Sequence, residues 1–110
     1  MSTAKLKRLQ SAGWKSGSAK DFLQLSDEEA MLVELKLALT DAVRLSRQKR
    51  GLSQIDLAQR MGSSQSRVAK MEAADRSVSL DLIMRSLLTI GATATDIAKW
   101  IKRAETARAA

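Results

Sequence analysis

The fold is decided by residues 52–72, which read LSQIDLAQRMGSSQSRVAKME. Ser53 stands where its hydroxyl can cap one short helix, with Asp56 as its reciprocal partner, and Ser64 stands where it can cap another. Gly62 supplies the left-handed or close-packed backbone that a sharp turn between two helices requires. The stretch therefore predicts two short helices joined by a tight turn, the second from about residue 65 to 73.

The side chains of these helices divide into an inner and an outer set. Small Ala58 lets the helices approach closely, and the predicted inner set is completed by Ile55, Met61, Val68 and Met71. The outer set of the second helix is polar and consists of Gln65, Ser66, Arg67 and Lys70.

The composition favours an all-α protein. The chain has 110 residues, which fits one compact domain of the usual size of roughly 100 to 150 residues. It contains no proline and only five glycines, so long helices are allowed and a turn-rich β architecture is disfavoured. We expect a compact bundle of about five helices.

Several functional classes lack their usual residues. The chain has no cysteine and no histidine, which removes thiolate metal sites, the commonest metal ligand and the usual general base. No glycine-rich phosphate loop or paired acid site is apparent. We expect no catalytic residue, no metal and no cofactor. No apolar run approaches the about 20 residues that span a bilayer, which favours a cytoplasmic protein without a membrane partner.

The charge points to an anionic partner. The formal net charge is +7, and residues 1–26 hold five basic side chains and one acidic side chain. Nucleic acid is the simplest polyanion, and an anionic membrane surface or an acidic protein are the alternatives.

Residues 1–25 read as a basic, partly flexible N-terminal arm, because Gly13 and Gly17 interrupt any helix. We expect its apolar side chains to pack against either a partner surface or the protein's own core. They are Leu6, Leu9 and Trp14.

A long helix over residues 27–50 is specified at both ends, by a capping box of Ser26 with Glu29 and by the stop at Gly51. Its off-stripe apolar residues, Met31, Leu37 and Leu45, are either exposed or part of a contact with another chain. Its predicted buried stripe is Leu32, Leu35, Leu39, Ala42, Val43 and Ser46.

Two more helices follow the motif. Ser79 caps a helix over residues 80–90 that ends at Gly91, and Thr93 with Asp96 opens a last helix toward residue 107. The inward side chains of the first are predicted to be Ile83, Leu87 and Ile90. The apolar face of the last helix is Ile97, Trp100, Ile101 and Ala104.

The residues 52–72 resemble the helix-turn-helix of the Cro and phage-repressor type, the XRE family. The resemblance is carried by Gln54, Ala58, Gly62, Val68, Met71-Glu72 and Ser79-Leu80. It implies a lambda-repressor-like DNA-binding domain over residues 26–91, preceded by the arm and followed by the C-terminal helix of residues 92–110.

The resemblance also implies roles for individual residues. The base-contacting residues would be Gln65, Ser66, Arg67 and Lys70, since glutamine can bond adenine while lysine and arginine favour guanine. Gln54 would lie near a phosphate, and Ser64 is either a phosphate contact or simply an N-cap. The sequence departs from the family after the second helix, where residues 73–75 replace the usual turn with glycine or asparagine. Arg76 would then compensate as a phosphate contact.

These observations predict a sequence-specific repressor that binds a double-stranded DNA operator as a homodimer. Ile97, Trp100 and Ile101 are the first candidates for the dimer interface, the alternative being that Trp100 packs within its own chain.

A second resemblance lies in Gly13-Trp14 and in residues 22–29, which look like bacterial antitoxins of the HigA type. It implies an alternative in which the protein also binds and neutralises a ribonuclease toxin. The suspected toxin contacts are Leu6, Leu9, Trp14 and Phe22.

Overall fold

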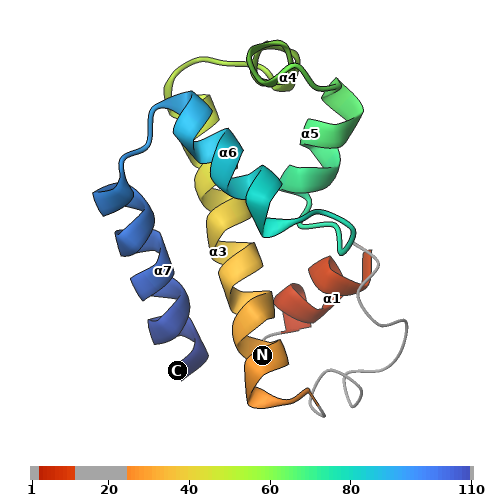
Figure 1. The fold of residues 1–110 in the computed structure, drawn as a ribbon. Helices are drawn as coiled ribbons and strands as arrows, with labels where there is room; N and C mark the ends of the chain where they lie inside the picture. Colours follow the sequence, from red (N-terminus) through yellow and green to blue (C-terminus); the bar gives the residue numbers. More distant parts are fainter. Residues whose placement is uncertain (1–2, 12–24, 110) are drawn as a thin grey trace.

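A computed structural model describes residues 3–11 and 25–109, and it is all-helical over these residues, with no strand among them (Figure 1). The helices are α1 (Thr3–Ser11), α3 (Asp27–Lys49), α4 (Gln54–Met61), α5 (Gln65–Glu72), α6 (Leu80–Ile90) and α7 (Ala94–Ala109). This confirms the predicted all-α bundle. None of the described helices is long and apolar enough to cross a membrane. The predictions that concern Gly13, Trp14, Gly17 and Phe22 fall outside the described residues.

The predicted caps fix the helix ends. The Ser26 hydroxyl accepts a hydrogen bond from the Glu29 amide at 3.1 Å, and the Ser53 hydroxyl accepts one from the Asp56 amide at 3.0 Å. Gly62 and Gly91 end α4 and α6 in the left-handed conformation, with φ of 64° and 107°. Because these caps satisfy orphan backbone groups at defined positions, the helices of residues 27–91 begin and end within one residue of their predicted bounds.

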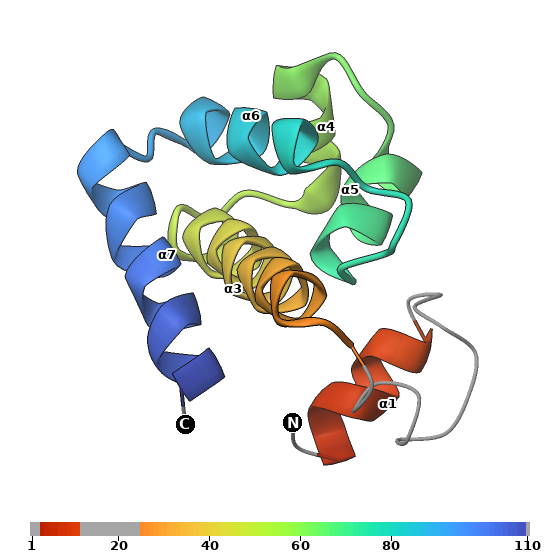
Figure 2. The same ribbon diagram turned by 60° about the horizontal axis from the view of Figure 1, so that its bottom comes forward.

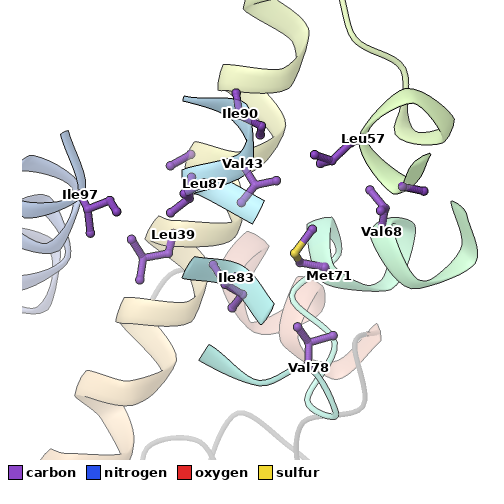
Figure 3. Close-up of a cluster of buried hydrophobic side chains, with 12 residues drawn as sticks. Leu39, Val43, Leu57, Val68, Met71, Val78, Ile83, Leu87, Ile90 and Ile97 are labelled. Carbon is purple, nitrogen blue, oxygen red and sulfur yellow. The ribbon is translucent and has the colours of Figure 1, made fainter. Parts of the chain in front are cut away.

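The main core is formed by residues from α3, α4, α5, α6 and α7. In Figure 3, Leu39 and Val43 of α3 lie opposite Leu87 of α6, and Ile97 approaches from α7. Figures 1 and 2 both show α7 along one side of α3 and α1 on the other. The predicted inward residues Val68, Met71, Ile83, Leu87 and Ile90 are all buried here.

A second, smaller cluster lies beneath α1, and it corrects the prediction for α3. Leu9 of α1 is buried against Val33, Leu37 and Ala74. Leu37, predicted to lie off the buried stripe, is only 4% exposed, whereas Leu32, predicted to lie on it, is 38% exposed. The reason is that α3 is covered on two sides, so a single stripe does not describe it.

The inner face of α4 also differs from the prediction. Ile55 is 56% exposed and Leu57 is fully buried, although Ile55 was the expected inward residue. Buried Ala58 and half-buried Met61 then complete the inner face. A helix of eight residues spans about two turns, so its apolar residues fit more than one rotation, and contact with α5 and α6 decides between them.

Candidate nucleic-acid interface

The outer face of α5 presents four polar side chains from within two turns of helix. Its inner face is fixed by buried Val68 and Met71, and the Ser64 hydroxyl caps its start by accepting from the Arg67 amide at 3.2 Å. The four outer side chains are all exposed, and they are Gln65, Ser66, Arg67 and Lys70.

The turn at Gly62 sets the angle between α4 and α5. The Ser63 amide donates to the Ala58 carbonyl at 2.8 Å, which closes the end of α4 as its backbone reverses. Ala58 is buried, and its small side chain permits this close approach. These contacts therefore fix the direction in which α5 leaves the turn.

A buried ion pair joins the end of α3 to the end of α5. The Arg47 guanidinium donates to both Glu72 carboxylate oxygens, at 2.6 and 2.8 Å, and to the Leu52 carbonyl at 2.8 Å. The Arg47 and Glu72 side chains are only 11% and 4% exposed. Hydrogen bonding to Glu72 raises the pKa of Arg47 against the opposing effect of burial. The pair holds α5 in place on α3.

Gln54 links this ion pair to the exposed face of α5. Its Nε2 donates to Glu72 at 3.3 Å, and its Oε1 accepts from Gln65 Nε2 at 2.8 Å. The Gln65 amide is thereby oriented by a chain of contacts that begins at Arg47. The sequence predicted only a phosphate contact for Gln54 and no partner for Arg47, because the partners of these side chains in the fold, Gln65 and Glu72, are 11 and 25 residues away.

The loop after α5 is held by two further sets of contacts. The Asp75 carboxylate accepts from the Ser77 hydroxyl at 2.6 Å and from its amide at 2.9 Å, and these bonds lower the pKa of Asp75. The Lys36 ammonium donates to the Val78 carbonyl at 2.8 Å, and burial is the main cause that lowers its pKa. Arg76 lies exposed on this loop, near the end of α5.

The turn that follows α5 has alanine at a position where the backbone conformation favours glycine or asparagine. Ala74 adopts the left-handed conformation, with φ of 58°, and it is 1% exposed. This conformation costs a residue other than glycine roughly 1–2 kcal/mol. The methyl group, however, packs beside Leu9 and Val33 under α1. The Arg8 guanidinium, also from α1, binds Asp41 at 2.8 Å and donates to the Glu72 carbonyl at 3.5 Å.

The three residues expected at a dimer interface are divided between the interior and the surface. Ile97 is buried in the main core, and half-buried Trp100 packs against that core. Ile101 is 39% exposed. Trp100 also lines a shallow apolar groove between α3 and α7, together with Ala38, Ala42 and Leu45.

A comparison with protein families matches residues 43–85 to the family described as Helix-turn-helix. The match starts near the end of α3, includes all of α4 and α5, and ends within α6. No significant match was found among curated proteins or among solved structures. The matched residues contain Gln54, Ala58, Gly62 and Val68, which carried the resemblance in the sequence.

Proposed function

We propose that this protein is a DNA-binding transcription regulator that acts as a sequence-specific repressor. The proposal is supported by the match of residues 43–85 to the Helix-turn-helix family and by the resemblance of residues 52–72 to the Cro and phage-repressor type. In this proposal, α5 enters the major groove of its operator. The observation that carries the proposal is the outer face of α5, where four polar side chains stand on a helix whose inner face is buried. A helix fits the major groove, and residues near its N-terminus reach the base edges.

The base-contacting residues of the proposal are Gln65, Ser66, Arg67 and Lys70. Gln65 is held by Gln54 at 2.8 Å, so less side-chain freedom is lost when its amide meets a base. Glutamine suits adenine, and arginine or lysine suits guanine, each good bidentate contact contributing about 1–3 kcal/mol of discrimination.

Gln54, Ser64 and Arg76 are the proposed phosphate contacts. Gln54 and Ser64 lie at the starts of α4 and α5, where free backbone amides and the helix dipole favour an anion. The Ser64 oxygen already accepts a hydrogen bond as the N-cap, and its hydroxyl can still donate to a phosphate. Exposed Arg76 supplies a positive charge beyond the other end of α5.

The test uses a duplex that the wild-type protein selects from a random-sequence pool, and a scrambled duplex of equal composition. We expect Gln65→Ala and Lys70→Ala to lose about 5- to 150-fold in affinity for the selected duplex, which corresponds to about 1–3 kcal/mol. The affinity for the scrambled duplex should decrease far less. Lys99→Ala, which removes an exposed positive charge from α7, should leave the ratio of the two affinities unchanged. If the ratio of the two affinities is unchanged in all three variants, the assignment of α5 as the base-contacting helix is wrong.

We further propose a homodimer that places two α5 helices in successive major grooves, about 34 Å apart. Of the three residues suggested for its interface, Ile101 is the one with a substantially exposed apolar side chain. Leu45, which is 60% exposed across the neighbouring groove, extends this apolar surface onto α3.

The antitoxin alternative, with a ribonuclease toxin as partner, has fewer surface anchors than the sequence suggested. Leu9, one of its four suspected contacts, is buried in the cluster beneath α1. Trp14 and Phe22 lie outside the described residues. Copurification with the product of a neighbouring small basic reading frame would favour this alternative.

A further inference from the structure

A pocket of about 540 Å³ lies where the end of α4, the turn at Gly62, and the helices α5 and α6 meet. Three arginines from three different helices line it: Arg60, Arg67 and Arg85. No carboxylate is among the described residues that line the pocket. The fold therefore gathers three guanidinium groups around one concave site.

The acidic residues nearby do little to neutralise this site. Asp81 pairs with Arg85 at 3.0 Å, but these side chains are 74% and 72% exposed, and such surface pairs contribute little. Asp56 lies one turn before Arg60, and its carboxylate is engaged as the capping partner of Ser53. Guanidinium groups gathered around one concave site favour an anionic ligand there.

Ser63, which lines the pocket, has a buried hydroxyl group that lacks a partner. Within the described part of the chain, Ser63 Oγ is buried and makes no hydrogen bond. A buried polar group left without a hydrogen-bond partner is unfavourable. A hydroxyl donor beside several guanidinium donors is suited to an oxyanion, and arginine in particular matches the geometry of phosphate.

The pocket lies on the flank of α5 opposite to Gln54. Gln54 contacts Gln65, and since an α-helix advances about 100° per residue, Arg67 projects from roughly the other side of α5. A helix in the major groove lies between two phosphate backbones. In a complex of the proposed kind, Gln54 would contact one backbone and the arginine pocket would lie toward the other.

We propose that this pocket binds a phosphate group, and that in the complex with DNA it holds a backbone phosphate beside the groove that α5 reads. The assignment of DNA as the source rests on the proposed function. The phosphate chemistry rests on Arg60, Arg85 and the Ser63 hydroxyl, and Arg67 lines the same pocket from the edge of the proposed base-contacting face.

The first arm of the test measures the salt dependence of binding to a duplex of mixed sequence. The log–log slope should fall by about 0.9 for a lost phosphate contact in Arg60→Ala and in Arg85→Ala. The slope of the double variant should fall by about the same amount in total, because both arginines contact one phosphate. Arg44→Ala is the matched control, since Arg44 also pairs with an aspartate on its own helix, at 3.3 Å from Asp41, and lies outside the pocket.

The second arm needs no DNA and titrates inorganic phosphate while the amide signals of Gly62 and Ser63 are followed by NMR. Saturable shifts in the wild type that vanish in the double variant support a phosphate site. If the salt-dependence slopes of the Arg60 and Arg85 variants match that of the Arg44→Ala control but the NMR shifts occur, the pocket binds a free phosphate-bearing ligand and not a DNA phosphate. If neither effect occurs, the pocket is not a phosphate site. A wild type that selects no duplex would instead refute the proposed function and leave this arm unaffected.

Discussion

Glu72 connects more of the site than any other single residue described. It accepts from Arg47 and from Gln54, and Gln54 in turn orients Gln65. The carboxylate thus couples the packing of α5 to the placement of a side chain on its outer face. A change at Glu72 should affect both the stability of the protein and its specificity for DNA.

Replacing Glu72 with alanine should lower the free energy of unfolding by about 3–5 kcal/mol, because the Arg47 guanidinium would remain buried without its partner. Urea denaturation measures this loss. Asp81→Ala is the matched control, since it also removes the carboxylate of an arginine pair, but from a pair more than 70% exposed. It should change stability by less than about 1 kcal/mol. Equal losses in the two variants would contradict the account.

At the level of single residues, polarity predicted which side chains of α5 are exposed, but it did not predict the contacts among them. Val68 and Met71 fix one face of the helix, so the exposure of Gln65 and Lys70 follows from sequence spacing. The bond between Glu72 and Arg47 depends on how α3 and α5 come together, and no local pattern specifies that arrangement.

At the scale of the helices, the bounds depend on local contacts, whereas burial depends on contacts with residues far along the chain. Capping residues lie within three positions of the amides they satisfy, so α3, α4 and α6 were predicted closely. The helix α1 was not predicted, because its burial depends on Val33, Leu37 and Ala74, far along the chain. The same contacts explain why Leu37 is buried.

Truncating the anchor of α1 tests whether this helix belongs to the folded unit. Leu9→Ala should lower the free energy of unfolding by about 2–5 kcal/mol, because it opens a cavity against Val33 and Leu37. Lys7→Ala, on the exposed side of α1, should have little effect in the same thermal or urea measurement. A loss below about 1 kcal/mol for Leu9→Ala would mean that α1 contributes little to stability.

The caps also give the helices a defined response to acid. Hydrogen bonds from the Ser53 and Thr93 backbones lower the pKa of Asp56 and of Asp96 below the ordinary value of 3.8. Since the pKa of each carboxyl group is lower in the folded state, its contribution is present above pH 3.8 and is lost as the pH falls through the lowered value.

Stability followed from pH 7 to pH 2 should therefore begin to decrease near pH 4, and the double variant Asp56→Asn/Asp96→Asn should show a shallower decrease. The chain has no histidine, so little change is expected between pH 5 and pH 7. An identical acid response in the double variant would show that these caps do not cause the decrease.

At the scale of the whole molecule, the proposed homodimer can be tested by substitutions on α7. Trp100 packs on the core of its own chain, so a charge there would disturb the fold as well as an interface. Ile101→Glu is the cleaner change, because this side chain is partly exposed. Analytical ultracentrifugation should show that it converts a wild-type dimer to a monomer with unchanged helix content.

Ile55→Glu provides the control for this change, since Ile55 has the same side chain and is also exposed, but on α4. It should leave the dimer intact. A wild type that remains monomeric at high concentration, or a dimer that survives Ile101→Glu, would remove α7 from the proposed interface.

The central claim is that the outer face of α5 distinguishes one DNA sequence from another. The most direct measurement is the ratio of wild-type affinities for the selected and the scrambled duplex at one salt concentration near the physiological value. The account predicts that the selected duplex binds about 10³-fold or more tightly, as is typical of specific recognition. Equal affinity for the two duplexes would contradict it, because the positive charge of the chain would then explain all of the binding.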